Sequence, residues 1–236
     1  MTNVPPALVV ERLRYRRPGS DGSGHAVEVD ELSLRSGEVL GLVGPSGCGK
    51  STLIDLFALL RRPTSVQGFK LHGEDVAALW QRGNVDRCTA LRAARIGVVL
   101  QTGGLLPSLT VRENVLLGQR LLGKLDIAWT HALLAKLDLT SLAARRPAQL
   151  SIGQRQRVAI ARALAHRPSL VLADEPTASL GVDHAPAAIQ LLLSLARDSG
   201  CALVVVSHDI ALLRAHGVPL RHCVSRSGAI ALEAAA

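Results

Sequence analysis

The sequence predicts an α/β fold built around a mostly parallel, doubly wound sheet. Short apolar runs with the length of buried strands recur at residues 39–43, 95–100, 170–173 and 202–206. Helical patterns lie between them, for example over residues 53–60 and 186–197. Strands that alternate with helices are typical of a sheet whose strands run parallel.

Length and composition fit one domain that carries a subdomain. A chain of 236 residues with 48% hydrophobic residues can bury a full core. The apolar run 202–206 falls far short of the roughly 18 residues that a membrane span needs. The N-terminus lacks a basic region followed by an apolar run, so no secretory signal is expected and we predict a cytoplasmic protein.

The formal charge of +8 is compatible with nucleic acid, with anionic lipid headgroups or with an arginine-rich genome. An aromatic content of 2% leaves few stacking platforms, and no reader motif is present, which argues against nucleic-acid binding. The four cysteines at positions 48, 88, 201 and 223 are too scattered for a zinc knuckle or a C-x-x-C pair. We expect free thiols in a reducing compartment.

The elements follow one another in a clear order. Residues 7–43 read as short β-runs around the polar loop 17–24 and predict a small antiparallel sheet. The strand at 95–100 ends at Gln101, and the segment 102–165 is helical, with a capping box from Thr110 to Glu113 and helical spacing over 132–139. Strands return at 170–173 and 202–206, and Gly200 ends the helix between them.

We therefore interpret residues 1–236 as a single domain. Its nucleotide-binding core takes residues 7–101 and 166–236, and residues 102–165 form an inserted helical subdomain.

A glycine-rich loop carries the most informative motif. Residues 44–52 read GPSGCGKST and match the phosphate-loop pattern G-x-x-x-x-G-K-[S/T]. The loop lies between an apolar strand and a helix, so bound phosphates would meet a helix N-terminus. Its glycines free backbone N–H groups for the phosphates, Lys50 supplies a charge to them, and Ser51 offers a hydroxyl to a metal ion. The predicted ligand is a nucleoside triphosphate with Mg²⁺. The nucleotide-binding residues expected in the loop are Gly44, Pro45, Ser46, Gly47, Cys48, Gly49, Lys50, Ser51 and Thr52.

Two adjacent acids end the apolar strand 170–173. Asp174 and Glu175 would reach the carboxyl edge of a parallel sheet, where such folds bind ligands. Neighbouring side chains alternate in direction on an extended chain, so Asp174 can face the metal ion while Glu175 acts as general base on a water. A solvated acidic turn is the alternative, and the phosphate loop upstream argues against it.

The segment 150–157, LSIGQRQR, resembles the LSGGQ signature of the ABC transporter ATPase family. Four other landmarks of that family follow the same order along essentially the whole chain: the phosphate loop, Gln101, the pair Asp174 and Glu175, and the run Ser207, His208 and Asp209. Residues 101–115 are similar to the lipoprotein-releasing and macrolide-exporter group. The resemblance implies a P-loop NTPase fold, ATP with Mg²⁺, and two cassettes paired head to tail around the nucleotides.

The resemblance also implies roles for single residues. Tyr15 would stack on adenine, Gln101 would reach the metal ion and the attacking water, and His208 would contact the γ-phosphate. Read from the residues alone, Tyr15 is a strand tyrosine, Gln101 a polar residue at a strand end and His208 a structural histidine.

The signature has two readings that can coexist. Ser151 is followed by Gln154 at capping-box spacing, which predicts that Ser151 caps its own helix. The resemblance implies that Ser151, Gly153 and Gln154 also belong to the nucleotide site, where Ser151 meets the γ-phosphate of the opposite subunit beside the Gly153 N–H.

Two positions depart from the family pattern. Ile152 replaces the first glycine of the signature, and a β-branched residue restricts the backbone there. Gly181 stands where the family usually has an aspartate that couples the two sites, and Asp183 would replace it only if the loop shifted by two residues. Because Lys50, Ser51, Glu175 and His208 are present, we still expect hydrolysis.

The expected function is the ATP-hydrolysing subunit of a membrane transporter or a related mechanotransmission complex. Its partners would be a second cassette, identical or paralogous, and integral membrane permease subunits that hold it at the inner face of the cell membrane. One alternative is a soluble ABC ATPase that acts on nucleic acid or translation, although such relatives usually carry a coiled-coil insertion or tandem cassettes. Another is a regulatory cassette that hydrolyses ATP weakly.

Overall fold

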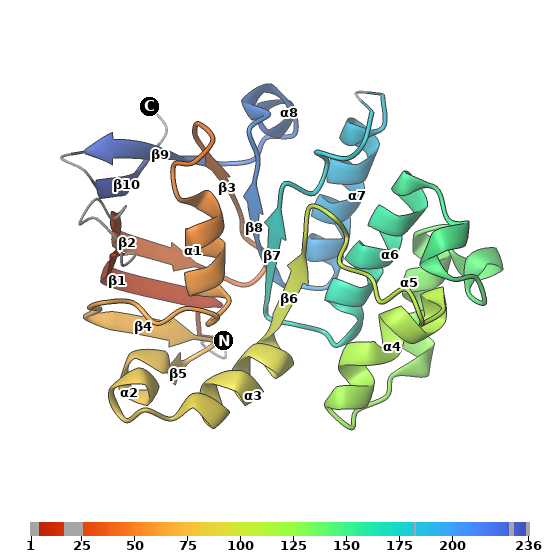
Figure 1. Cartoon of the computed structure of the whole chain (residues 1–236), viewed down its shortest axis with the longest axis horizontal. Coiled ribbons are helices and arrows are strands. Elements are labelled where there is room, and N and C mark those ends of the chain that lie inside the picture. The colour runs from red at the N-terminus through yellow and green to blue at the C-terminus, as the bar shows by residue number, and fades with distance from the viewer. Residues whose placement is uncertain (1–4, 17–25, 182, 227–228, 235–236) are drawn as a thin grey trace.

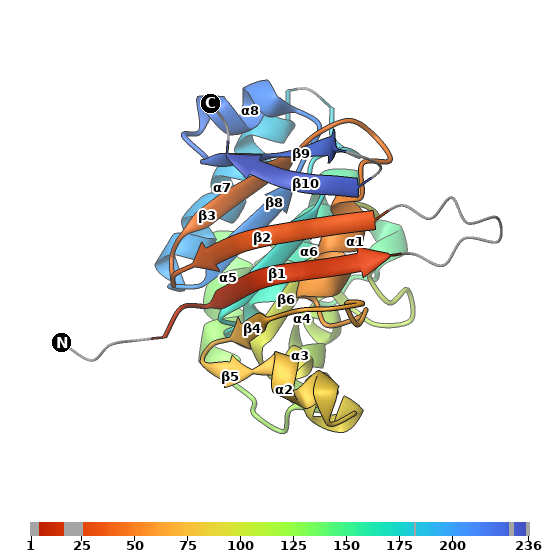
Figure 2. The ribbon, with the colours of Figure 1, turned by 90° about the vertical axis from the view of Figure 1, so that its left-hand side faces the viewer.

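One continuous ten-stranded sheet organises the chain (Figures 1 and 2). The computed structural model describes residues 5–16, 26–181, 183–226 and 229–234, so the predicted polar loop 17–24 lies outside the described residues. The strand order is β5-β4-β1-β2-β10-β9-β3-β8-β7-β6. The strands are β1 (Leu8–Arg16), β2 (Ala26–Leu34), β3 (Val39–Val43), β4 (Gly68–Leu71), β5 (Glu74–Asp75), β6 (Ile96–Val99), β7 (Leu170–Asp174), β8 (Ala202–Val206), β9 (Leu220–Arg226) and β10 (Ala229–Ala234).

Helices cover the sheet and fill the inserted segment. They are α1 (Lys50–Phe57), α2 (Val76–Gln81), α3 (Val85–Arg95), α4 (Val111–Leu121), α5 (Ile127–Lys136), α6 (Ile152–Ala165), α7 (Ala185–Asp198) and α8 (Ile210–Ala215), with short 3-10 turns at Thr140–Leu142 and Pro147–Gln149. No helix in the described part of the chain is both long and apolar enough to cross a membrane.

The parallel strands form the half of the sheet that positions the site. β8 lies between β3 and β7 and pairs parallel with both, and β6 pairs parallel with β7. The carboxyl ends of β3 and β7 therefore lie at the same edge of the sheet. The expectation that residues 39–43 belong to the small antiparallel sheet is wrong, because β3 finds its partners in β8 and β9.

An antiparallel flank continues the same sheet. β1 pairs with β2 on one side and with β4 on the other, and β5 closes the edge. β10 joins this flank to the parallel half through β2 and β9. Four strands were not predicted. β4 and β5 have only four and two residues, and β10 carries alanine and glutamate, which are depleted in strands. β9 has the sequence LRHCVSR, in which polar and charged residues interrupt the apolar ones.

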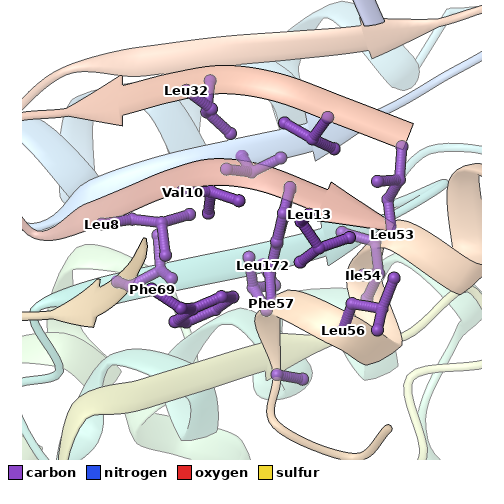
Figure 3. Packing of buried hydrophobic residues seen from close by; sticks show 14 of the residues in the cluster. Leu8, Val10, Leu13, Leu32, Leu53, Ile54, Leu56, Phe57, Phe69 and Leu172 are labelled. Atoms are coloured by element: carbon purple, nitrogen blue, oxygen red, sulfur yellow. The ribbon is translucent and has the colours of Figure 1, made fainter. Parts of the chain in front are cut away.

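Two hydrophobic cores lie on opposite faces of the sheet. Along β7, Leu170 and Leu172 belong to the core beneath α1, whereas Val171 and Ala173 belong to the core that packs α6 and α7. Side chains that alternate in direction along a strand produce this division. Figure 3 shows the first core, where Phe57 of α1 lies close to Leu172 and the β1 side chains point toward α1. The doubly wound arrangement is confirmed, and the phosphate loop connects β3 of this sheet to α1.

Helices α4, α5 and α6 lie together beyond the parallel edge (Figure 1). The predicted capping box is confirmed: the Glu113 N–H donates to the Thr110 hydroxyl oxygen at 3.2 Å, and the Thr110 N–H donates to Glu113 Oε2 at 2.8 Å. The boundaries of α5 were wrong, since the helix spans Ile127–Lys136 and the buried Leu137 and Leu139 that extended the pattern follow it.

Two further boundaries differ from the prediction. α1 begins at Lys50, inside the loop motif, and ends at Phe57, whereas the apolar pattern placed it at 53–60. Helices α2 and α3 were missed, because α3 is strongly polar on its exposed face. The predicted helix 186–197 is confirmed as α7, and Gly200 follows it with φ +65°.

Gly97 of β6 is the point where the sheet touches the helical segment most closely. A Cβ added at Gly97 would overlap the carbonyl oxygen of Ala163 in α6. We expect Gly97→Ala to lower the free energy of unfolding by about 1–3 kcal/mol, the usual cost of overpacking, as measured by urea denaturation. Gly181→Ala is the matched control, because no atom lies within 4 Å of the added Cβ. Equal unfolding midpoints for the two variants would contradict this packing.

Candidate active site

The loop between β3 and α1 has a backbone that needs glycine. Gly44, Gly47 and Gly49 have φ values of +151°, +79° and +81°. A Cβ on Gly44 would lie 2.9 Å from both the Cys48 Sγ and the Cys223 carbonyl oxygen. Side chains at these positions would thus strain the backbone or collide with neighbours, and the turned backbone presents N–H groups at the start of α1.

Lys50 folds back over this loop. Its Nζ donates to the carbonyl oxygens of Gly44 at 2.9 Å and Pro45 at 2.8 Å, and lies 3.7 Å from the Cys48 Sγ. The residue is only 8% exposed. No ion pair of the described residues includes Lys50, and its closest oxygen partners are the two loop carbonyl groups. A shielded ammonium of this kind attracts an anionic ligand.

Asp174, at the end of β7, lies against the start of α1. It accepts a hydrogen bond from the Ser51 hydroxyl. Burial is the main reason that the pKa of Asp174 lies above its ordinary value. The bond from Ser51 lowers this pKa, while the nearby charges of Glu175 and Asp55 raise it and the charge of Lys50 lowers it. Ionisation of this carboxyl group is therefore disfavoured chiefly by its removal from water.

Glu175 follows in an unusual backbone conformation. Its φ is +48°, in the left-handed region, and its N–H donates to the carbonyl oxygen of Val206 at 3.0 Å. The expectation that the two acids separate by the alternation of an extended chain is therefore wrong, because the chain turns at Glu175. A left-handed conformation costs a non-glycine residue on the order of 1–3 kcal/mol, and such strain clusters at functional sites.

His208 holds the Glu175 side chain. Its Nδ1 lies within hydrogen-bonding distance of Glu175 Oε2, at 2.9 Å. The Glu175 side chain is 16% exposed and that of His208 is 66% exposed.

Lys50, Asp174 and Glu175 border one cleft with a volume of about 340 Å³, and His208 is not among its lining residues. It is lined by Tyr15, Val27, Ser46, Gly47, Gly49, Lys50, Ser51, Thr52, Asp174, Glu175 and Val206. The structure thus brings the predicted loop, both acids and Tyr15 together. Of the other loop positions, Cys48 is buried beneath the loop, and Gly44 and Pro45 hold Lys50 through their carbonyl groups.

Tyr15 lies near the end of β1, at the side of the cleft. Its hydroxyl accepts a hydrogen bond from Arg61 Nη1 at 3.2 Å, and the Arg61 guanidinium carbon lies 5.9 Å from the ring centroid. Asp55 of α1 in turn accepts from Arg61 Nε at 2.8 Å. This support was missed at the sequence level, because Arg61 and Tyr15 are 46 positions apart and no local pattern links them.

Gln101 does not line the cleft. It is exposed, in a turn that follows β6. Arg162 of α6 holds this turn, donating from Nη1 to the Gly104 carbonyl oxygen at 2.7 Å and from Nη2 to that of Gly103 at 2.9 Å. Arg162 was missed as well, and the one signal for it is an arginine within the otherwise apolar second half of α6.

The signature residues lie at the start of α6. Ser151 caps the helix as predicted: its hydroxyl oxygen accepts from the Gln154 N–H at 3.2 Å, and Gln154 Oε1 accepts from the Ser151 N–H at 2.9 Å. Ser151 and Gly153 line a second cleft of about 970 Å³ between α6 and α7. Ile152 and Gly181, the two departures from the family pattern, border this second cleft too, and Ile152 is 50% exposed.

Comparison of the sequence with known proteins identifies its family. The sequence profile of ABC transporters matches residues 27–178, which contain the phosphate loop, the signature and both acids. The chain belongs to the ABC transporter family. As a member of this family it is an ATP-binding cassette.

Two curated relatives of this ABC cassette act in different systems. The lipoprotein-releasing system ATP-binding protein LolD 1 of Rhodospirillum rubrum is 42% identical over 187 residues, which cover 78% of this chain and 80% of LolD 1. The methionine import ATP-binding protein MetN of Cupriavidus necator is 40% identical over 212 residues, or 88% of this chain. The match spans only 59% of the length of that MetN.

A solved ABC cassette has the same fold. The dimeric, post-hydrolysis structure of the ATP-binding cassette MJ0796 bound to ADP and phosphate has a TM-score of 0.76 and 30% identity to this chain. The likeness covers 94% of this chain and 96% of that one.

The electrostatics of Asp174 predict how the nucleotide-free cassette responds to pH. A folded-state pKa above the ordinary value of 3.8 means that ionisation of Asp174 lowers the stability of the fold progressively as the pH rises from 3.8 to the raised pKa, and to the full extent above it. Asp174→Asn keeps an acceptor for Ser51 and should raise the urea midpoint at pH 7. The gain should shrink as the pH falls through the folded pKa. Asp30→Asn, at an exposed acid, is the control, and a loss of stability in Asp174→Asn at pH 7 would contradict the assignment.

Proposed function

We propose that this chain binds and hydrolyses ATP, and that hydrolysis drives a membrane transporter whose membrane-spanning subunits are separate chains. The observation that carries the proposal is the cleft at the carboxyl ends of β3 and β7. It gathers a shielded ammonium, a hydroxyl and two carboxylates at a helix N-terminus in a member of the ABC transporter family.

The triphosphate would lie along the loop. The loop N–H groups and Lys50 would bind its phosphate oxygens, so that Lys50 exchanges its two carbonyl partners for stronger, charged ones. Tyr15 would stack on the adenine ring from the side of the cleft, with Arg61 fixing its hydroxyl. Gly49 and Thr52 line the same cleft and would contact the nucleotide between its phosphates and its adenine ring.

The donor set of the cleft fits Mg²⁺. Ser51 and Asp174 offer oxygen ligands in contact with each other, and burial raises the pKa of Asp174, a cost of ionisation that a bound cation would offset. We propose Ser51, Asp174 and Gln101 as the residues that hold the ion, with Gln101 entering the cleft by a movement of its turn. The ion would supply charge neutralisation for the phosphate oxygens.

Glu175 is the proposed general base. Its carboxylate would accept the proton of the water that attacks the γ-phosphate, and its hydrogen bond to His208 fixes the direction of one carboxylate oxygen. His208 would keep its contact with Glu175 through Nδ1, and its other ring nitrogen would approach the γ-phosphate. Because the backbone of Glu175 is left-handed, its side chain leaves the regular alternation of β7, and its carboxylate would act separately from that of Asp174.

The site needs a second copy of a cassette to be complete. Ser151 and Gly153 line a cleft separate from the one that holds Lys50, so the signature of one chain does not serve the phosphate loop of that chain. We propose a head-to-tail pair, identical or paralogous, in which the N-terminus of α6 and Ser151 approach the γ-phosphate in the partner. The dimeric state of the MJ0796 cassette supports this arrangement.

The proposed location follows from the partners. A cassette bound to permease subunits would lie in the cytoplasm at the inner face of the cell membrane. Relatives from a lipoprotein-releasing system and from methionine import match this chain about equally well, so the cassette does not distinguish between cargoes. We propose that the membrane subunits select the cargo.

Glu175→Gln tests the base. The variant removes the proton acceptor but keeps a side chain of the same size, so turnover should fall by about 10²- to 10⁴-fold while ATP affinity is preserved. Phosphate release and ATP binding by calorimetry measure the two quantities. Glu74→Gln, at an exposed ion pair, is the control and should keep normal turnover. Hydrolysis at the normal rate in Glu175→Gln would show that another group is the base.

Lys50→Ala tests the phosphate loop. Loss of the ammonium should weaken ATP binding by about tenfold or more, because a charge-assisted contact to the phosphates disappears. Calorimetric titration gives the dissociation constant, with the exposed Lys124→Ala as control. Unchanged ATP affinity in Lys50→Ala would place the nucleotide elsewhere.

A further inference from the structure

Two cysteines that are far apart in the sequence meet beneath the phosphate loop. Cys48 lies in the loop and Cys223 in β9, and they are 9% and 2% exposed. Their thiol groups are hydrogen bonded to each other. A Cβ placed on Gly44 would lie 2.9 Å from the Cys48 Sγ and 3.1 Å from the Cys223 Cβ, so both side chains pack on the same glycine. The absence of a side chain at Gly44 is what lets the thiols approach.

The two thiols have unequal surroundings. Cys48 Sγ accepts a hydrogen bond from the Lys50 ammonium at 3.7 Å, and a cation beside a sulfur favours its reaction as a nucleophile. Cys223 is enclosed, and burial together with the neighbouring Cys48 raises the pKa of Cys223 to about 12. Cys48 is therefore the first thiol to react and Cys223 the resolving one.

The remaining cysteines are isolated from this pair. Cys201 donates from its thiol to the Ala196 carbonyl oxygen at 3.6 Å, and burial raises its pKa to about 11. Burial also raises the pKa of Cys88. Neither has a thiol partner among the contacts of the described residues, so the paired arrangement is specific to Cys48 and Cys223.

We propose that Cys48 and Cys223 form a reversible disulfide that ties the phosphate loop to β9 and weakens ATP binding. A peroxide is the oxidant. The Cys48 sulfur attacks one peroxide oxygen, the O–O bond breaks and water leaves, which gives a sulfenic acid. The Cys223 sulfur then attacks the Cys48 sulfur, the S–O bond breaks and a second water leaves with the remaining thiol proton. Two thiols and one hydrogen peroxide thus give one disulfide and two waters, and a dithiol reductant reverses the change.

The disulfide would act on the nucleotide through the loop. A sulfur–sulfur bond of about 2.05 Å is far shorter than a thiol hydrogen bond, so Cys48 must be drawn toward β9. Gly44 lies in contact with both side chains, and Lys50 loses its sulfur acceptor. A loop held in this way loses the freedom to turn its N–H groups toward phosphates. This consequence rests on the proposed function, whereas formation of the bond does not.

The experiment uses the purified full chain. The chain is treated with hydrogen peroxide, its free thiols are alkylated, and mass spectrometry identifies disulfide-linked peptides. In parallel, calorimetry measures the ATP affinity before oxidation, after oxidation and after reduction by dithiothreitol. We expect a peptide pair linking residues 48 and 223, an ATP affinity weaker by about tenfold or more, and recovery on reduction. Bound Mg-ATP should slow the formation of the bond, because it holds the loop in place.

Two variants separate the disulfide from other oxidation. Cys223→Ala should keep its ATP affinity after peroxide treatment, and Cys201→Ala, which removes another buried thiol, should lose it as the unmodified chain does. If Cys223→Ala loses affinity to the same extent, oxidation of Cys48 alone is responsible and the proposal is overturned. The protection by Mg-ATP gives a second test in the unmodified chain, should Cys223→Ala fold poorly.

The possible failures are distinguishable. Absence of the linked peptide under peroxide overturns the disulfide, and a linked peptide with unchanged ATP affinity overturns its effect on the loop. If the reduced chain binds no ATP at all, the proposed function and the proposed effect on ATP both fail, and peptide mapping still shows whether the two cysteines pair.

Discussion

The parallel pairing of β3, β8 and β7 is the constraint on which the rest of the structure depends. It brings the phosphate loop after β3 and the acids after β7 to one edge of the sheet. The hydrogen bond between Ser51 and Asp174 is the direct result, since it joins the start of α1 to the end of a strand more than a hundred residues later. The two hydrophobic cores keep this edge rigid from both faces.

Several features of the cleft oppose stability and serve ligand binding. Lys50 is buried against carbonyl groups, the pKa of Asp174 is raised, and Glu175 adopts a left-handed backbone. A protein evolved for stability alone would have no use for any of these, and all three favour a ligand that brings negative phosphates together with a cation. The same crowding places Cys48 against Cys223, where the ligand-binding loop becomes open to control by oxidation.

The separation of the two clefts shapes the proposed mechanism. The phosphate loop lines one cleft and the N-terminus of α6 borders the other, and in the proposed head-to-tail pair the two would meet across the contact between chains. Ile152 and Gly181 both lie at the second cleft, where they change the surface offered to a partner and leave the groups around Lys50 untouched. In the proposed pair, Ile152 and Gly181 would therefore act on the contact between cassettes, and the residues around Lys50 on nucleotide binding.

The sequence by itself determined the local features. The glycines and Lys50 of the loop, the caps at Thr110 and Ser151, and the buried strands could be recognised because they depend on nearby residues. Only the tertiary structure decided that β3 joins the parallel half, that Glu175 turns toward His208, that Arg61 supports Tyr15 and that Cys223 meets Cys48. These contacts join residues distant in sequence, and they arise from the packing of the whole sheet, which leaves no periodic or local pattern in the chain.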